Sequence, residues 1–313
     1  MGLHILSLMP LPGFQQAVEA RVPGAVVTVA EQGKVPKGLA PVDCLLTAVV
    51  GVDGLEHALS TYPTIDWVHV FGTGVDNFPI DCVGDRQLTC SRGASAVPIA
   101  EWVMAMMLAV EKQLPDVWIH EPPTDWHRSF SLSSLAGKQL GLVGFGGIGR
   151  AIAQRANAFD MDVFALTRSS TITSPGVRQV GDINELVGVA DHLVLAAPAT
   201  EATAQLMNAA VLTSMKEGSH LVNIARGSLV DNDSLKYALD NGPVAFASLD
   251  AVEPEPLPEG HWLYSHPKVR LSPHVSWSEP HAFETLVSLF LDNLVTYAAG
   301  GTLAGSVDKA AGY

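Results

Sequence analysis

The chain has 313 residues, is 48% hydrophobic, and carries a formal net charge of −14 with a pI near 5.1. This length predicts two domains, and the acidic balance argues against nucleic acids and anionic membranes as partners, because both carry phosphate. No run approaches about 18 uninterrupted apolar residues, so no membrane span is expected. The start lacks the basic segment of a signal peptide. Three cysteines without a C-x-x-C pair indicate reduced thiols and a cytoplasmic protein.

Short apolar runs alternate with helical patterns through the first 93 residues. Strands are expected at 3–8, 25–30, 44–49 and 67–71, with helices at 14–21 and 55–61. This alternation is typical of βαβ units, whose parallel sheet has helices on both faces. The first part of the chain is therefore predicted to be one open α/β unit.

A long apolar helix and an extended arm are expected next. Residues 95–112 are apolar almost all round, which predicts burial on more than one side. Two alternatives stay open for this helix: a core element, or a connector that also meets a second subunit. Glu101 inside it is expected to make a structural hydrogen bond near the domain hinge. Residues 114–128, rich in Trp and Pro, predict a surface crossing.

A second α/β unit is expected to begin at Gly141. Strands are predicted at 140–144, 162–166, 193–196, 221–223, 245–249 and 269–271, and helices at 148–159 and 182–187. The last helix, from 279 to about 299, is apolar on one face. Its position predicts that it returns to the first unit.

The stretch G-F-G-G-I-G at 144–149 follows an apolar strand and opens a helix, the context that a dinucleotide site requires. Gly144 permits a tight turn, Gly146 lets a pyrophosphate approach the backbone, and Gly149 lets helix and strand pack closely. Gly147 and Ile148 begin the helix, whose free N–H groups and dipole favour an anion. We therefore predict a dinucleotide cofactor.

The identity of that cofactor depends on the end of the next strand. Thr167 lies 18 residues beyond Gly149, where a carboxylate usually holds the adenosine ribose and would repel a 2′-phosphate. Arg168 offers a planar fork matched to phosphate, and Ser169 adds a hydroxyl donor. This pattern favours NADP(H), with NAD(H) possible. The alternative is a solvated Arg168 and ambivalent specificity.

Polar residues also follow the later strands, at the edge where open α/β sheets bind ligands. They are Arg226, Asp250, Glu255 and His274. Hydride transfer to a ketone leaves an alkoxide that needs a proton, which a histidine can supply at neutral pH. A carboxylate on the other ring nitrogen fixes the tautomer, and an arginine can grip a substrate carboxylate bidentately. The pattern predicts that these side chains converge beside the nicotinamide.

Together these motifs resemble the D-isomer-specific 2-hydroxyacid dehydrogenases over nearly the whole chain. The resemblance rests on the glycine loop, on M-K-E-G-S-H-L-V-N-I-A-R-G-S-L-V-D (215–231), on L-D-A-V-E-P-E-P-L-P (249–258) and on S-P-H (272–274). It implies two doubly wound, Rossmann-like parallel sheets with the active site in the cleft between them.

The resemblance also implies a role for each site residue. Arg226 would bind the carboxylate of a 2-oxo acid and help polarise its ketone. His274 would be the acid/base, and Glu255 would orient and charge it. Asp250 would hold the nicotinamide carboxamide, and Pro198 is a further candidate cofactor-binding residue.

The stretch F-G-T-G-V-D at 71–76 matches the family's substrate loop. Backbone amides near Thr73 and Gly74 would then complete the carboxylate site. Trp277, three residues after His274, replaces the smaller residues common in the family, so it either narrows the substrate pocket or only packs. Asp160 stands where the family usually has Gly, which predicts a left-handed helix end.

The family's organisation implies a flavodoxin-like, substrate-binding domain at 1–93 and 281–313, and a dinucleotide-binding domain at 94–280. It also implies a homodimer formed through the helix at 95–112. We expect no metal, because no histidine pair has convincing ligand spacing. The residues end shortly after the expected return helix, so the regulatory C-terminal domain of some phosphoglycerate dehydrogenases is not expected.

Within the family, Glu255 argues against formate dehydrogenase, which has Gln at that place. An NADP(H)-leaning member of this length resembles glyoxylate/hydroxypyruvate reductases, which reduce small 2-oxo acids to D-2-hydroxy acids. The alternatives are a reductase of bulkier aromatic or branched 2-oxo acids and a catalytically weak, nucleotide-sensing protein like the corepressors of this fold.

Overall fold

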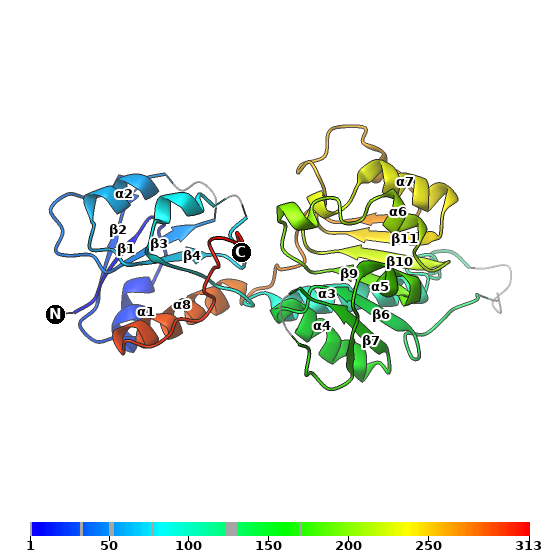
Figure 1. Ribbon diagram of the computed structural model, residues 1–313, viewed down its shortest axis with the longest axis horizontal. Coiled ribbons are helices and arrows are strands. Elements are labelled where there is room, and N and C mark those ends of the chain that lie inside the picture. The colour runs from blue at the N-terminus through cyan, green and yellow to red at the C-terminus, as the bar shows by residue number, and fades with distance from the viewer. Residues whose placement is uncertain (1, 32–33, 50–52, 77, 123–129, 169–170) are drawn as a thin grey trace. The chain divides into compact units, whose positions relative to one another are not determined.

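The computed structural model describes residues 2–31, 34–49, 53–76, 78–122, 130–168 and 171–313. The chain divides into two compact units, one made of residues 1–95 and 279–313 and the other of residues 96–278 (Figure 1). These boundaries lie two residues from those expected. Each unit is a parallel sheet with helices on both faces, which confirms the predicted fold class.

The first unit is built on a five-stranded sheet with the order β2-β1-β3-β4-β5, and every neighbouring pair is parallel. Its strands are β1 (His4–Ser7), β2 (Val26–Val29), β3 (Cys44–Ala48), β4 (Trp67–Phe71) and β5 (Gln87–Cys90). This order is that of flavodoxin-like sheets. Strand β5 was not predicted, because its Q-L-T-C sequence is no apolar run.

Helices cover both faces of this sheet. On one face lie α1 (Phe14–Arg21) and α8 (Ala282–Ala298), and on the other lies α2 (Leu55–Thr61). Helix α8 packs onto the sheet through Phe290, whose ring stacks on Trp67 with centroids 5.3 Å apart. The last helix thus belongs to the first unit although 183 residues separate the unit's two segments.

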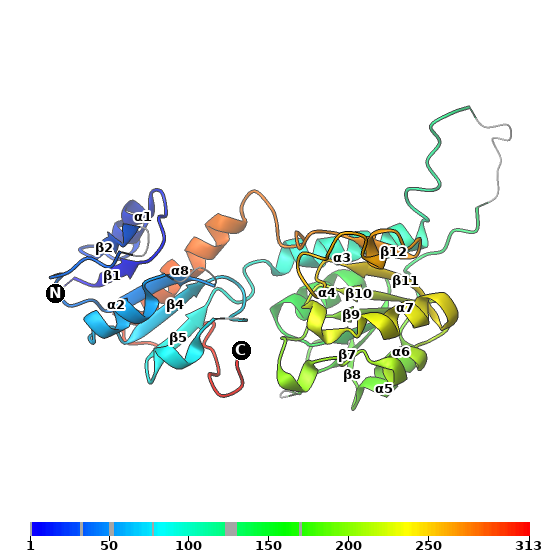
Figure 2. The same cartoon turned by 90° about the horizontal axis from the view of Figure 1, so that it is seen from above.

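The second unit is built on a seven-stranded sheet with the order β12-β11-β10-β9-β6-β7-β8, again parallel throughout (Figure 2). Its strands are β6 (Gln139–Val143), β7 (Asp162–Leu166), β8 (Val177–Gln179), β9 (His192–Leu195), β10 (Ser219–Asn223), β11 (Val244–Leu249) and β12 (Val269–Leu271). The chain proceeds outward in both directions from the centre. The reversal point between β6 and β9 is where such sheets bind their ligands.

Two cores sandwich this sheet. One packs α3 (Ala96–Glu111) and α4 (Gly147–Ala158) on the first face, and the other packs α5 (Ile183–Val189), α6 (Ala209–Thr213) and α7 (Asn232–Asn241) on the second. Strand β8 and helices α6 and α7 were not predicted. Short 3₁₀ turns lie at η2 (Ile80–Val83), η3 (Glu201–Thr203), η4 (Gly227–Leu229) and η5 (Trp262–Tyr264).

Helix α3 corrects one expectation. Only one stripe of it is buried, including Ile99, Val103 and Met107, whereas Ala105 is exposed. The expected burial on more than one side is therefore met only in part, because full burial is confined to this stripe while Trp102 and Leu108 are half-buried against the same core. Glu101 is exposed and forms an ion pair with Arg155 of α4 at 3.1 Å, so it contributes to the helix pair.

Several local expectations can also be compared with the structure. Asp160 has φ 57°, which confirms the left-handed helix end. Cys44, Cys82 and Cys90 are free thiols. Within the described ranges, no helix is long and apolar enough to cross a membrane. In the same ranges, no three His, Cys, Asp or Glu side chains cluster as metal ligands would.

Candidate active site

The candidate residues of the second unit follow the carboxyl ends of its strands. The segments that carry them come after β6, β9, β10, β11 and β12, and they contain Gly144, Pro198, Arg226, Asp250 and His274 respectively. Because all these strands are parallel, the five segments emerge at one edge of the sheet. The topology thus gathers residues that lie 130 positions apart.

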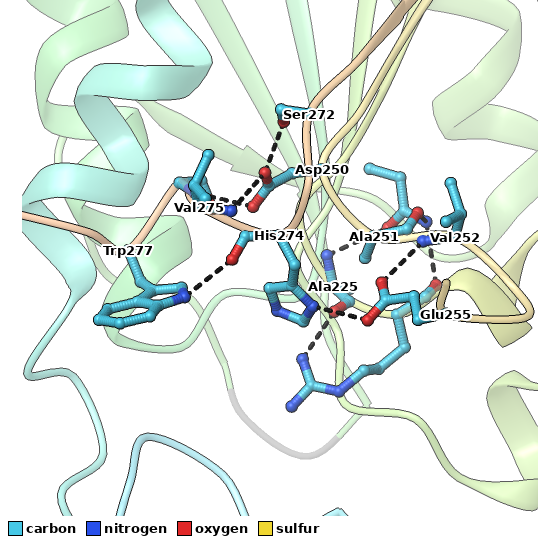
Figure 3. Close-up of polar contacts among 12 residues, drawn as sticks. Ala225, Asp250, Ala251, Val252, Glu255, Ser272, His274, Val275 and Trp277 are labelled. Atoms are coloured by element: carbon cyan, nitrogen blue, oxygen red, sulfur yellow. Dashed lines mark hydrogen bonds and ion pairs between the residues drawn. The ribbon is translucent and has the colours of Figure 1, made fainter. Parts of the chain in front are cut away.

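His274 and Glu255 form a direct pair at this edge (Figure 3). Nδ1 of His274 lies 3.0 Å from Oε2 of Glu255, and Oε1 of Glu255 accepts a hydrogen bond from the Val252 amide at 3.0 Å. Both side chains are roughly half-exposed. The carboxylate is therefore held by its own loop and fixes one nitrogen of the imidazole, which leaves Nε2 as the second ring nitrogen available for proton transfer.

This contact shows which of two glutamates meets His274, a choice that the sequence did not allow without the family resemblance. Glu253 and Glu255 are both exposed and both precede a proline. The side chain of Glu255 faces His274, whereas Glu253 contributes its backbone carbonyl to a hydrogen bond from Asn232 at 2.8 Å. The geometry therefore favours Glu255 as the partner of the imidazole.

Asp250 anchors the loop that carries His274. It is 1% exposed, and its Oδ1 accepts hydrogen bonds from the Ser272 hydroxyl at 2.5 Å and the Val275 amide at 2.8 Å. Its Oδ2 accepts from the Ser276 amide at 2.9 Å. Both carboxylate oxygens are thus engaged by this loop. The expected contact with a nicotinamide carboxamide stays a prediction.

Arg226 lies next to the loop of Glu255 because the two backbones nearly touch. A Cβ atom on Gly227 would lie 1.9 Å from the carbonyl carbon of Val252, so only glycine fits there. The Asn223 side-chain amide donates to the Arg226 carbonyl at 2.9 Å and to the Ala251 carbonyl at 3.2 Å, which ties both loops together. The half-buried Arg226 donates from Nη1 to the Ala225 carbonyl at 2.7 Å.

Trp277 is fixed by a polar contact with the same loop. Its indole Nε1–H donates to the carbonyl of His274 at 2.9 Å, while the residue stays 46% exposed. Neither reading from the sequence, a pocket wall or a packed side chain, included this hydrogen bond.

The glycine loop fits a dinucleotide. Gly144 has φ 98° and its Cβ would meet the Ala196 backbone at 2.8 Å, and a Cβ on Gly149 would meet the Gly144 carbonyl oxygen at 2.5 Å. Both glycines are therefore required by the chain's own packing. A Cβ on Gly146 would meet nothing within 4 Å, so the backbone there is open to a ligand. No side chain of the described residues caps the start of α4 at Gly147 and Ile148.

The strand that would end at the adenosine ribose is β7. It is followed by the half-buried Thr167 and the exposed Arg168. Ser169 lies outside the described residues. At the position of the usual carboxylate the chain therefore presents a hydroxyl, with a guanidinium beside it.

Thr73 and Gly74 belong to the other unit, in the loop that follows β4. A Cβ on the neighbouring Gly72 would lie 2.3 Å from Cγ2 of Val49, and the Gly72 carbonyl accepts from the Ser91 amide at 2.8 Å. This close approach fixes the start of the loop. Thr73 and Gly74 are half-exposed at the carboxyl edge of their own sheet.

Sequence reasoning missed the residues that hold the site residues in place. The motifs alone do not predict the contacts made by Gly227, Asn223 and Ser272. Asn223 did carry a signal, since it is a buried amide at the end of an apolar strand, directly before a loop. Such a side chain usually satisfies loop backbone groups.

Known proteins are similar to this chain over much of its length. The family model described as D-isomer specific 2-hydroxyacid dehydrogenase, NAD binding domain, matches residues 104–276. A D-3-phosphoglycerate dehydrogenase of Bacillus subtilis is 33% identical over 236 residues, covering 73% of this chain and 44% of that protein. The chain thus spans less than half the length of this relative.

Two further alignments cover more of both this chain and the similar protein. A glyoxylate reductase of Thermofilum pendens is 30% identical over 277 residues, which cover 85% of this chain and 80% of that protein. Among solved structures, an NADPH-dependent glyoxylate/hydroxypyruvate reductase of Sinorhizobium meliloti, in complex with NADP and sulfate, aligns with a TM-score of 0.81. Its sequence identity is 25%, and the alignment covers 100% of both chains.

Proposed function

Because the chain belongs to the D-isomer-specific 2-hydroxyacid dehydrogenase family, we propose that it is an NAD(P)-dependent 2-oxo acid reductase. Its substrate is a small 2-oxo acid of the glyoxylate or hydroxypyruvate class, and its product is the D-2-hydroxy acid. The observation that carries this proposal is the 3.0 Å pair of His274 and Glu255, on the same sheet edge as the glycine loop.

The cofactor is NADPH in preference to NADH. Gly146, open to a ligand, and the uncapped start of α4 fit a pyrophosphate. Thr167 cannot repel a 2′-phosphate, and Arg168 can bind it through a planar fork. When bound, the reduced nicotinamide supplies the hydride that adds to the keto carbon. Pro198 and Asp250 would lie against the same cofactor.

The protein's own residues bind the substrate and supply the proton. Arg226 binds the carboxylate of the 2-oxo acid, and its positive charge polarises the adjacent ketone. We infer that backbone amides at Thr73 and Gly74, in the first unit, also bind substrate. The imidazolium of His274 donates a proton from Nε2 to the oxygen that becomes the hydroxyl. Glu255 stabilises the charge on the ring and keeps Nε2 directed at the substrate.

Initial rates of NADPH and NADH oxidation test the proposal. We expect fast NADPH-dependent reduction of glyoxylate and hydroxypyruvate, slower reaction with phenylpyruvate, and at least about a 100-fold loss of turnover in His274→Ala. The variant, purified in the same way, controls for contaminating reductases. Faster reduction of phenylpyruvate would shift the substrate to bulky 2-oxo acids. Binding of NADPH without turnover of any acid would favour a nucleotide-sensing protein instead.

We also propose that the protein is a cytoplasmic homodimer. The free thiols Cys44, Cys82 and Cys90 are suited to a reducing compartment. Val97 of α3 is 49% exposed on the apolar helix, which supports an interface there. Light scattering tests this: we expect the mass of two chains, and a shift toward one chain in Val97→Asp.

A further inference from the structure

We propose that Trp277 is a positioning residue for the acid/base His274, acting through the peptide bond between His274 and Val275. This inference rests on the proposed function, because it assigns Trp277 a part in the same proton transfer. It replaces both the pocket-wall and the packing interpretations of this tryptophan.

The peptide unit between His274 and Val275 is hydrogen-bonded at both its C=O and its N–H (Figure 3). Its carbonyl, from His274, accepts the indole Nε1–H of Trp277 at 2.9 Å. Its amide, from Val275, donates to Oδ1 of the buried Asp250 at 2.8 Å. Rotation of a peptide unit held at both its C=O and its N–H would weaken a hydrogen bond on each side. The backbone on either side of the imidazole is thereby fixed.

The backbone of His274 needs such a restraint. Its φ is 54°, in the left-handed region that residues other than glycine rarely adopt. A conformation of this kind costs free energy and persists only where the surrounding contacts determine it. Asp250 holds the amides that follow His274, and Trp277 holds its carbonyl. Without the indole N–H, the peptide would be held on one side only.

The consequence reaches the side chain because Cβ of His274 moves with its backbone. The imidazole meets Glu255 at 3.0 Å, and Glu255 is itself fixed by the Val252 amide. A small rotation of the 274–275 peptide would therefore weaken the ring's contact with Glu255, whose carboxylate is also held by the Val252 amide. An enzyme turns over more slowly when the contacts that orient its acid/base residue are removed.

The exposure of Trp277 separates this role from ordinary packing. The residue is 46% exposed, so burial contributes little to holding its ring. Its N–H donor, not its volume, is the feature that the site uses. Phenylalanine keeps most of the ring and removes only the donor, so Trp277→Phe is the informative substitution. Trp262→Phe, on a turn after the Glu255 loop, is the matched control.

The first measurement concerns the resting protein. Long-range ¹H–¹⁵N correlation spectra report the tautomer of His274 through its carbon-bound ring protons, with His274→Ala for assignment. We expect the wild type and Trp262→Phe to show the Nδ1-protonated form that donates to Glu255. Trp277→Phe should show a mixture of tautomers. An unchanged tautomer in Trp277→Phe would overturn the proposal, whether or not any acid is turned over.

The second measurement is kinetic. We expect Trp277→Phe to lower kcat about 10-fold, equally for glyoxylate and phenylpyruvate, with KM within about 2-fold of the wild type. A change confined to KM for the bulkier acid would make Trp277 a pocket wall and overturn the positioning role. If the wild type reduces no 2-oxo acid, the proposed function fails, and the tautomer of His274 alone decides the role of Trp277.

Discussion

Gly227 and Val252 approach so closely that a Cβ atom on the glycine would lie 1.9 Å from the valine carbonyl carbon. This contact joins the loop of Arg226 to the loop of Glu255. We predict that Gly227→Ala destabilises the protein by about 1–3 kcal/mol, the usual cost of overpacking, and lowers turnover. Urea unfolding and steady-state rates would measure the two effects.

Gly188→Ala is the control for that substitution. Gly188 lies in α5, is exposed, and would place its Cβ in open space. Alanine there should leave turnover unchanged and stabilise the helix by about 0.5–1 kcal/mol. Wild-type stability and turnover in Gly227→Ala would show that the two loops can separate without cost.

Glu255 and Glu253 offer a second matched pair. Only the carboxylate of Glu255 meets Nδ1 of His274, at 3.0 Å. We predict that Glu255→Gln lowers kcat by about 10- to 100-fold, because a neutral amide stabilises the imidazolium less, while Glu253→Gln retains the wild-type rate. Steady-state kinetics with NADPH and glyoxylate compare them. Equal losses in both variants would assign the effect to the loop as a whole.

Much of the fold could be predicted because its signals are local. The sequence alone reveals the apolar runs of β1, β3, β4 and β6 and the amphipathic pattern of α8. Strand β5 could not be found, because Thr89 is buried as a polar residue. Its hydroxyl is satisfied by the side chains of Trp67 and His69, which come from a strand about 20 residues earlier. A polar residue whose burial depends on hydrogen-bond partners in another strand produces no hydrophobic periodicity in its own strand.

The site divides in the same way. His274, Arg226 and Glu255 are reactive residue types at strand ends, so chemistry singles them out. The residues that hold them, Asn223 and Gly227, act through contacts about 28 and 25 residues along the chain. Such contacts appear only once the strands are placed side by side.

Arg168 carries the cofactor prediction. It is exposed at the end of β7, beside Thr167 where a ribose-binding carboxylate is absent. We predict that Arg168→Ala weakens NADPH binding about 10- to 100-fold, the worth of a charge-assisted hydrogen bond, and leaves NADH binding unchanged. Fluorescence titration with both cofactors measures this.

The control for a general loss of positive charge is Arg178→Ala. Arg178 lies on the neighbouring β8 and pairs with Asp162 at 3.5 Å, with its side chain 69% exposed. Its removal should leave both cofactor affinities unchanged. If Arg168→Ala weakened NADH as much as NADPH, Arg168 would not read the 2′-phosphate.

His69 makes the stability of the first unit depend on pH. Its ring is fully buried, with Nδ1 2.8 Å from the Thr89 hydroxyl and Nε2 3.0 Å from the Ser91 hydroxyl. Burial lowers the pKa of His69 from 6.5 to about 3. The unfolded chain therefore takes up a proton near pH 6.5, whereas the folded unit does not until about pH 3. The free energy of unfolding that this site contributes is complete above pH 6.5 and falls on acidification.

Below pH 6 the free energy of unfolding should fall by about 1.4 kcal/mol per pH unit, because unfolding takes up one proton at this site. Urea unfolding at pH 7, 6 and 5 would measure it in the wild type and in His69→Gln, whose amide can still bond both hydroxyls. The variant should lose this part of the slope, while His57→Gln, at an exposed position of α2, should retain it. Parallel pH dependence in the wild type and His69→Gln would mean that His69 takes up its proton in the folded unit as readily as in the unfolded chain.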